Sequence, residues 1–484
     1  MRNTIKKILE YGDFQSPSSL VDQACLLLKE LGVVPASLVE PTCGIGNFFL
    51  SALERFPSAK YAVGLEINSD YVENLSLFLK GKKFAAKSRL LCCDFFSIPW
   101  EEIVEDLPRP LLVIGNPPWV TSDQLGRRNQ TNLPPKSNFK NLTGLSALTG
   151  KGNFDISEWM LLRIFNKLKE GDVMAMICKT TVARRVLDQA WKENAIGFKF
   201  SLYRVNAKKY FGVSVDTCFF ICRRIRNAVR FECAVFEKFD KIKPDHIIGY
   251  RGGTLVADST LYDRWQHLEI FGQRLWRSGI KHDCSRVMEL RRVDNRFRNG
   301  FGDSVDLESD FLYPMLKSSD LVNGSVEDPD RVMIVTQTKI GGDTAPIREK
   351  APKTWAYLQR YGSLLDKRRS FIYRKRPRFS VFGVGEYSFS LWKVAISGFY
   401  TNLRFRCVGP ARSKPIALDD TTYFIPCESE THAKRLYEGL NSKPAEEFFR
   451  ALIFSDSKRP VTAELLNRLN LSLLTEASVR MKRE

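Results

Sequence analysis

One pattern recurs four times in the first 120 residues: a short apolar run ends in a polar residue, and a helix-like stretch follows. Such runs predict buried strands, and their alternation with helices predicts a parallel, doubly wound α/β sheet. In this kind of sheet the carboxyl ends of the strands share one edge, where ligands bind. The residues that the pattern places at this edge are Glu40, Glu66, Asp94 and Asn116.

The fourth run, residues 112–115, ends in the turn Asn116-Pro117-Pro118-Trp119. Prolines fix the backbone φ angle and carry no N–H donor, so we expect the carbonyls of Asn116 and Pro117 to stay free as acceptors. An amide acceptor, a free carbonyl and an indole face together suit a flat ring that carries an exocyclic amino group. The turn is therefore the predicted site of the substrate ring.

The three earlier strand ends predict a nucleotide-like cofactor. Glu40 precedes a glycine turn at 44–46, which lacks the lysine of a phosphate-binding loop and the spacing of a dinucleotide fingerprint. An acid there suits an amine-bearing ligand, although a plain strand–helix connection is the alternative for the glycine turn alone. Glu66 can accept both hydroxyls of a ribose. Asp94 can accept from an adenine amino group, and Phe95 can pack on its ring.

Over about residues 11–225 these motifs resemble, in type, order and spacing, those of the N6-adenine DNA methyltransferases of the amino-terminal-cofactor-domain (gamma) group, as in restriction–modification systems. The resemblance implies that the turn 116–119 is the catalytic, base-binding motif, although tyrosine or phenylalanine is more usual there than Trp119. It also implies that Trp119 and Phe211 stack on the two faces of the base; core packing is the alternative for Phe211. The residues that it assigns to S-adenosylmethionine binding are Ser16, Glu40, Thr42, Gly44, Gly46, Glu66, Ile67, Asp94, Phe95, Asn116 and Pro118.

The same resemblance implies a class I S-adenosylmethionine-dependent methyltransferase fold, with a Rossmann-like, doubly wound sheet, followed by a mixed α+β target-recognition domain. The chain changes character near residues 223–226, after which it shows basic and aromatic interleaving and no further nucleotide-type turn. We therefore expect a catalytic domain at 1–230 and a DNA target-recognition domain at 231–484.

The chain carries 74 Lys and Arg against 55 Asp and Glu, a net charge of +19, so a polyanionic partner is the first interpretation and a merely basic protein the alternative. A polar loop at 121–152 and basic runs at 291–298 and 367–379 are candidate contact segments, although many charge runs are only solvated faces. The residues predicted to contact double-stranded DNA are Arg127, Arg128, Lys136, Arg368, Arg369, Arg374, Lys375, Arg376 and Arg378.

Cysteine and histidine usage bears on cofactors and location. The eleven cysteines form no CxxC pair and predict reduced, buried thiols, and all four histidines follow residue 240, so the expected site holds no histidine-ligated metal. No run approaches the length of a membrane span, and the start of the chain lacks a signal-peptide apolar region. We expect a cytoplasmic protein of bacterial, archaeal or phage origin that binds neither metal nor membrane.

The combined prediction is a sequence-specific enzyme that transfers a methyl group from S-adenosylmethionine to N6 of a flipped-out adenine in duplex DNA, with S-adenosylhomocysteine as product. Three alternatives stay open: N4-cytosine methylation of DNA, methylation of RNA or of a protein amide, and a non-catalytic binding module on the same fold. The expected setting is a restriction–modification system, in which the protein acts as a monomer beside a separately encoded restriction endonuclease.

Overall fold

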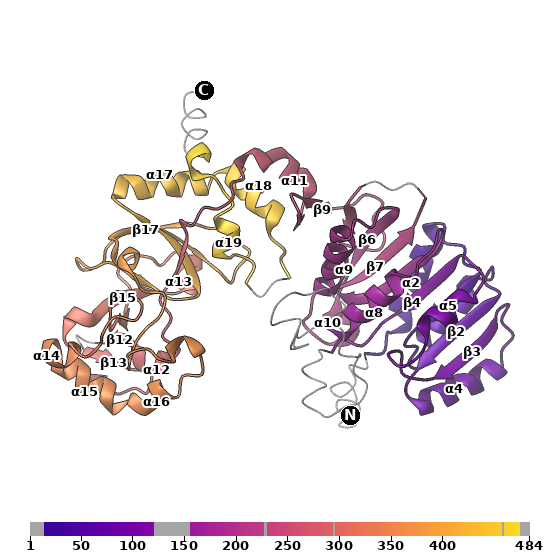
Figure 1. Ribbon diagram of the computed structural model, residues 1–484, viewed down its shortest axis with the longest axis horizontal. Helices are drawn as coiled ribbons and strands as arrows, with labels where there is room; N and C mark the ends of the chain where they lie inside the picture. The colour runs from indigo at the N-terminus through magenta and orange to yellow at the C-terminus, as the bar shows by residue number, and fades with distance from the viewer. Residues whose placement is uncertain (1–13, 121–154, 227–229, 294–295, 457–458, 475–484) are drawn as a thin grey trace. The chain divides into compact units, whose positions relative to one another are not determined.

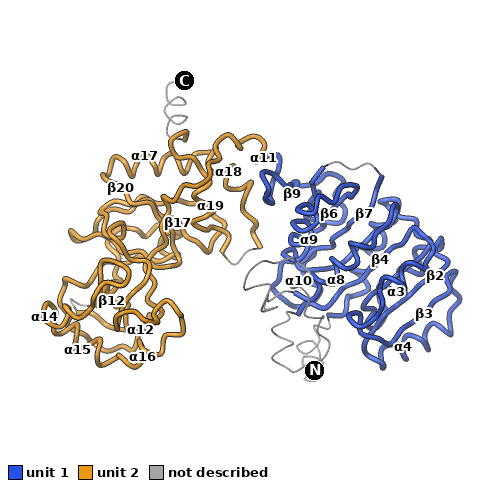
Figure 2. Tube along the Cα trace, viewed as in Figure 1, with its two compact units in different colours: residues 1–260 blue, residues 261–484 orange. Residues whose placement is uncertain are grey.

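The computed structural model describes residues 14–120, 155–226, 230–293, 296–456 and 459–474. The chain forms two compact units, residues 1–260 and 261–484 (Figure 2). None of the helices in the described ranges is long and apolar enough to cross a membrane.

A ten-stranded sheet with the strand order β10-β9-β8-β6-β7-β5-β4-β1-β2-β3 organises the first unit (Figure 1). The five strands from β3 to β5 run parallel, and β7 runs antiparallel between β5 and β6. This arrangement confirms the predicted parallel, doubly wound sheet. The strands are β1 (Ser37–Glu40), β2 (Tyr61–Glu66), β3 (Lys87–Cys92), β4 (Leu111–Gly115), β5 (Val173–Lys179), β6 (Phe198–Val205), β7 (Thr217–Arg224), β8 (Glu232–Phe236), β9 (His246–Arg251) and β10 (Thr254–Val256).

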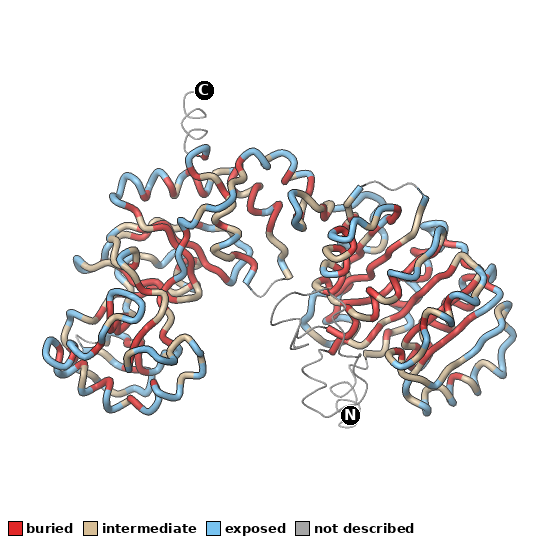
Figure 3. Tube along the Cα trace, in the orientation of Figure 1, coloured by how far each residue is buried: buried red, intermediate tan, exposed pale blue. Residues whose placement is uncertain are grey.

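Both faces of the sheet are buried at its central strands β1 and β4. Leu38 and Leu112 pack with α2 and α3 in one apolar cluster, while their strand neighbours Val39 and Val113, which point to the other face, are also buried. The buried residues form continuous bands along the strands in Figure 3. The helices of this unit are α2 (Ser18–Glu30), α3 (Asn47–Arg55), α4 (Ser69–Lys80), α5 (Trp100–Glu105), α8 (Ile156–Phe165), α9 (Thr180–Lys192) and α10 (Ala207–Phe211).

The first unit extends to residue 260, beyond the boundary expected at 230. The reason is that β8 pairs in parallel with β6, with Phe200 opposite Cys233, and β9 and β10 then add to the same sheet. The basic run at 223–226 therefore includes the end of β7, and the compact unit continues past this change in sequence character.

The second unit is mixed α+β, as expected, with two sheets ordered β11-β20-β17-β18 and β14-β13-β12-β16-β15-β19. Their strands are β11 (Arg277–Ser278), β12 (Glu289–Val293), β13 (Arg296–Arg298), β14 (Ser304–Val305), β15 (Leu312–Leu316), β16 (Arg331–Ile334), β17 (Trp392–Ser397), β18 (Arg406–Val408), β19 (Ala417–Leu418) and β20 (Thr422–Cys427). The helices are α11 (Ser259–Trp265), which begins at the boundary, α12 (Ser285–Met288), α13 (Ser318–Asn323), α14 (Ile347–Lys350), α15 (Pro352–Arg360), α16 (Gly362–Asp366), α17 (Glu430–Leu440), α18 (Lys443–Leu452) and α19 (Ala463–Leu466).

Candidate active site and cofactor site

The predicted site residues of the first unit gather at one edge of its sheet. Strands β1, β2 and β4 are parallel, so Glu40, Glu66 and Asn116 leave the sheet on the same side. Gly115, directly before the turn, has a φ of 156°, and a Cβ there would lie 3.2 Å from Cγ of Glu40. A glycine at this position therefore lets the Glu40 side chain lie against the strand that carries the turn.

The Asn116 side-chain amide is held in one orientation. Its Nδ2 donates to the backbone carbonyl of Phe14 at 2.8 Å and to Oγ of Ser16 at 3.2 Å. Oδ1 is buried and accepts no hydrogen bond from the described residues. The Asn116 carbonyl receives only a long contact of 3.5 Å from Oγ1 of Thr42, and no described residue donates to the carbonyl of Pro117. The turn thus presents a buried amide oxygen and a carbonyl as acceptors.

The aromatic side chains beside the turn touch one another. The Trp119 ring centroid lies 4.9 Å from that of Phe211 at an interplanar angle of 73°, and 5.1 Å from that of Phe14 at 32°. Trp119 is only 5% exposed, and its Nε1 has no hydrogen-bond partner among the described residues. The expected sandwich of Trp119 and Phe211 about a base is therefore not preformed, because an edge-to-face pair leaves no room for a ring between its members.

The Glu66 carboxylate accepts hydrogen bonds from the glycine turn and from the residue that precedes α4. One Glu66 carboxylate oxygen accepts from the backbone N–H of Gly44 at 2.8 Å and the other from that of Asn68 at 2.9 Å. Gly44 and Gly46 have φ angles of 51° and 91°, and a Cβ on Gly44 would lie 2.7 Å from Oε1 of Gln15. The positive φ angles therefore favour glycine at both Gly44 and Gly46.

Glu40 fits the amine-bearing ligand that its position predicts. The residue is only 3% exposed, and its Oε2 has no hydrogen-bond partner among the described residues. Burial raises the pKa of the Glu40 carboxyl well above its usual range; the backbone N–H of Phe49 opposes this rise and the nearby Glu66 adds to it. A positively charged amine placed here would satisfy the free oxygen and favour the ionised carboxylate.

After β3, Asp94 lies as expected at the end of the strand, but the Phe95 side chain does not face a ligand site. Oδ1 of Asp94 accepts from the backbone N–H of Phe96 at 3.0 Å, which fixes the carboxylate at the end of β3. Phe95, expected to pack on an adenine ring, is only 4% exposed and packs against Trp100 at a centroid distance of 5.1 Å. Ile67, at the end of β2, is 46% exposed and offers an accessible apolar surface.

A buried ion pair supports the turn from the next strand, and sequence reasoning did not give it a role. Nζ of Lys179, at the end of β5, donates to the Trp119 carbonyl at 3.2 Å and pairs with Asp155 at 2.5 Å. Asp155 is 5% exposed and also caps α8 by accepting from the backbone N–H of Ser157 at 3.2 Å. The available signal was the position of Lys179 at the ligand-binding edge of the sheet.

The predicted DNA-contacting residues fall into three groups. Arg127, Arg128 and Lys136 lie outside the described residues. Arg368 was expected to contact DNA, but its side chain is engaged within the protein. Its guanidinium donates to the carbonyls of Leu365, His282 and Ser380 and lies 3.7 Å from the centroid of the Tyr373 ring. The side chains that remain at the surface are Arg369, Arg374, Lys375, Arg376 and Arg378, the last of which pairs with Asp366 at 2.8 Å.

A solved structure shares this fold. The type IIL restriction–modification enzyme MmeI, solved in complex with DNA, superposes with a TM-score of 0.57 at 15% identity, over 93% of this chain and 64% of that one. The chain therefore spans about two thirds of the length of MmeI, and this likeness concerns the fold alone. The fold is that of the class I S-adenosylmethionine-dependent methyltransferases.

Sequence similarity identifies the family. The type II methyltransferase M.NspV of Nostoc sp. (strain ATCC 29411 / PCC 7524) is 43% identical over 481 residues, which cover 98% of this chain and 99% of that protein. The chain belongs to the type II methyltransferases of restriction–modification systems. No protein-family model matches the chain. Among the described residues, no group of three or more His, Cys, Asp or Glu side chains could hold a metal ion.

Proposed function

We propose that this protein is a sequence-specific DNA methyltransferase that modifies N6 of a flipped-out adenine in duplex DNA. The observation that carries the proposal is the Asn116 amide, whose Nδ2 is held by two acceptors while Oδ1 is buried and free among the described residues. A buried acceptor without a donor costs free energy, so it points to a ligand that supplies an N–H group.

The exocyclic amino group of adenine is a weak nucleophile because its lone pair is delocalised into the ring. Oδ1 of Asn116 and the carbonyl oxygen of Pro117 would accept its two hydrogens and so direct the nitrogen lone pair out of the ring system. Because Phe14 and Ser16 fix the amide before the base arrives, no reorganisation is needed at the moment of reaction. Positioning and electrostatics then account for the rate enhancement by the protein.

S-adenosylmethionine, when bound, supplies an electrophilic methyl group, and its transfer leaves S-adenosylhomocysteine. Glu40 would pair with the ammonium group of its amino-acid end, and Glu66, whose carboxylate is held at the end of β2 by the backbone N–H groups of Gly44 and Asn68, would accept the ribose hydroxyls. Asp94 and Ile67 would contact the adenine ring of the cofactor at the ends of β3 and β2. Phe95, which is buried, would support that contact from behind.

A base in a duplex cannot reach this site, so it must leave the helix. Trp119 and Phe211 would then separate from edge-to-face contact and hold the base on its two faces. The aromatic contacts of Trp119 with Phe14 and Phe211 would be exchanged for contacts with the base, which limits the net cost of opening.

The remaining parts of the proposal concern setting and partners. The second unit would be the DNA target-recognition domain, in which the exposed basic residues at 369–378 neutralise phosphates. As a modification enzyme of a restriction–modification system, the protein would act as a cytoplasmic monomer beside a separately encoded restriction endonuclease.

The test is the chemical identity of the product. Purified protein is incubated with tritiated S-adenosylmethionine and genomic DNA that lacks prior methylation, and the DNA is digested to nucleosides and analysed by mass spectrometry. N6-methyladenine is the expected product. Detection of N4-methylcytosine would show that the target is cytosine and not adenine. The absence of any methylated nucleoside, with cofactor binding intact by calorimetry, would refute the catalytic proposal.

A further inference from the structure

The hairpin formed by β12 and β13 carries three arginines on one face. Arg291 lies opposite Arg298 in the antiparallel register, and Arg296 lies two residues before Arg298 on the same strand. Because side chains alternate along a strand, these three point to the same side of the sheet. Arg292 lies on the other side, where its guanidinium is 5.4 Å from the Phe297 ring centroid.

These three arginines are exposed and not neutralised. None of them forms an ion pair with a carboxylate of the described residues, whereas Arg331, the register neighbour of Arg291 on β16, pairs with Asp320 at 2.8 Å. Like charges directly opposite each other on a sheet are destabilising. The conspicuous absence of counter-charge at Arg291 and Arg298, within the described part of the chain, indicates that an external anionic or electron-rich partner supplies it.

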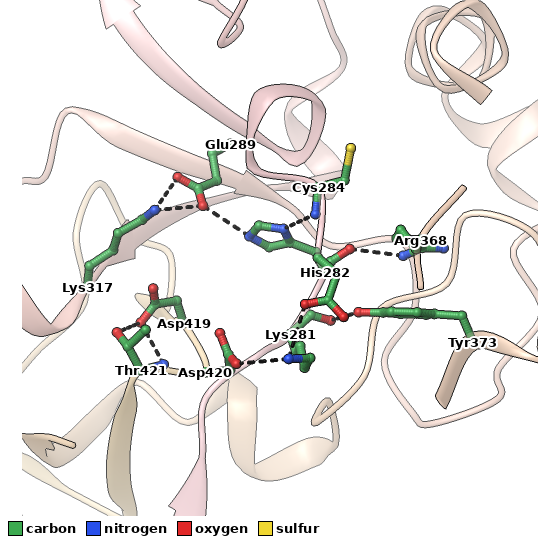
Figure 4. A network of polar contacts seen from close by, with 11 residues as sticks. Lys281, His282, Cys284, Glu289, Lys317, Arg368, Tyr373, Asp419, Asp420 and Thr421 are labelled. Carbon is green, nitrogen blue, oxygen red and sulfur yellow. Dashed lines mark hydrogen bonds and ion pairs between the residues drawn. The ribbon is translucent and has the colours of Figure 1, made fainter. Parts of the chain in front are cut away.

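The end of the hairpin that lies away from its turn is firmly held. Glu289, the first residue of β12, accepts from Nε2 of His282 at 3.2 Å and from Nζ of Lys317 at 2.6 Å (Figure 4). Nδ1 of His282 in turn accepts from the backbone N–H of Cys284 at 3.2 Å. β16 pairs with residues 289–291 of β12, and β14 pairs with residues 297–298 of β13, so Arg291 and Arg298 lie where the sheet is four strands wide. The arginine face therefore has a rigid support on both sides.

We propose that the arginine face of the β12–β13 hairpin, formed by Arg291, Arg296 and Arg298, lies against the major groove of the target duplex and that these side chains reach into it to read guanine. This inference rests on the proposed DNA methylation and assigns part of its sequence recognition. Some DNA-binding proteins place the strands of a β-sheet along a groove, and a guanidinium can donate two hydrogen bonds to O6 and N7 of guanine in the major groove.

The choice of side chain favours base reading over a simple phosphate contact. All four cationic residues of the two strands are arginine and none is lysine. A phosphate tolerates the point charge of a lysine, but bidentate recognition of a guanine edge requires the planar fork of arginine. A solvated surface face, for its part, would not need to place two arginines directly opposite each other.

The experiment compares two double variants of the full-length protein, Arg291→Ala/Arg298→Ala and Arg291→Lys/Arg298→Lys, with the wild type. The matched control is Arg404→Ala/Arg435→Ala, which removes two exposed arginines of the same unit on and next to α17. Modified-base sequencing of DNA from cells that express the wild type first gives the methylated site. Affinity for a duplex with that site and for a scrambled duplex is then measured by fluorescence anisotropy at fixed salt.

We expect the alanine variant to lower the ratio of specific to non-specific affinity about tenfold or more, while the control leaves the ratio unchanged. The lysine variant should keep its non-specific affinity but methylate sites with a changed base at one or two positions. The unfolding midpoint of the alanine variant should not fall, since two facing like charges are removed. The inference is overturned if the alanine variant weakens both duplexes equally, or if the lysine variant keeps the wild-type site. A wild type that methylates no DNA refutes the proposed function instead.

Discussion

Replacement of Asn116 by alanine should lower kcat about a hundredfold or more with almost no change in stability. The substitution removes two hydrogen bonds, to the Phe14 carbonyl and to Oγ of Ser16. At about 1 kcal/mol each, their loss costs about 2 kcal/mol. It also removes the buried Oδ1 that has no donor among the described residues, and relief of such an atom returns about 1–3 kcal/mol. The two terms nearly cancel, so the free energy of unfolding should change by less than about 1 kcal/mol.

The effect on rate should be large, because the acceptor that localises the lone pair of the substrate amine is lost. Removal of one preorganised hydrogen-bonding group from a reaction centre costs about a hundred- to a thousandfold in kcat, or about 3–4 kcal/mol. The rate is measured by single-turnover transfer of tritiated methyl to DNA, and stability by urea denaturation. DNA affinity should stay close to that of the wild type.

The matched control is the same substitution at Asn441, an asparagine whose amide is fully used. Its Oδ1 accepts from the backbone N–H of Phe405 at 3.2 Å, and its Nδ2 donates to the carbonyl of Tyr437 at 2.9 Å. Asn441→Ala should therefore lose about 2 kcal/mol of stability and leave the methyl-transfer rate unchanged. A variant Asn116→Ala that is destabilised by more than 3 kcal/mol, or that transfers methyl within tenfold of the wild-type rate, would refute the reasoning.

Three further predictions follow from the same contacts. Trp119→Tyr should be nearly neutral while Trp119→Ala lowers kcat/KM in steady-state methylation, since only the aromatic variant keeps a face for the base; an unimpaired alanine variant would mean that the indole is only packing. Lys179→Ala leaves the buried Asp155 unpaired and should lower the free energy of unfolding in urea by about 3 kcal/mol, with partial recovery in Lys179→Ala/Asp155→Ala. Burial raises the pKa of Glu289, but the hydrogen bonds from His282 and Lys317 lower it by more, so this pKa lies below its usual value of 4.5. Its ionised form therefore stabilises the protein above pH 4.5, and the stability advantage over Glu289→Gln in thermal unfolding should shrink as pH falls through the folded-state pKa.

The strand ends at Glu40, Glu66 and Gly115 were predictable because each is marked by a local pattern: an apolar run, a turn residue and a following helix. The end of the first unit was not, because it depends on which strands pair. The strand β8 follows a basic connection that resembles a linker, and only its pairing with β6 joins it to the first sheet. The composition of the chain shows where the basic run lies, but it does not show that β6 is the strand with which β8 pairs.

Side-chain packing at the site was equally beyond sequence reasoning. Trp119 and Phe211 are far apart in sequence, yet their rings are in contact. The resemblance to the methyltransferases instead implied that a base separates the two rings. Arg368 belongs to a dense basic run, and nothing in that run distinguishes the one guanidinium that turns inward to three carbonyls from its exposed neighbours. Charge counts predict a surface, but only the backbone path decides which side chains reach it.

Residues 14–16 contact both the glycine turn and the Asn116 amide, which are far apart in sequence. Oε1 of Gln15 accepts from the backbone N–H of Ile45 in the glycine turn, at 3.2 Å, and the carbonyl of Ser16 accepts from Nδ2 of Asn47 at 2.7 Å. The same segment provides both acceptors that orient Asn116. A shift of the glycine turn would therefore move the groups that hold the amide. Under the proposed function, the direction of Oδ1 decides whether the substrate amine meets an acceptor, so we expect occupation of the cofactor site to act on the orientation of the Asn116 amide through residues 14–16.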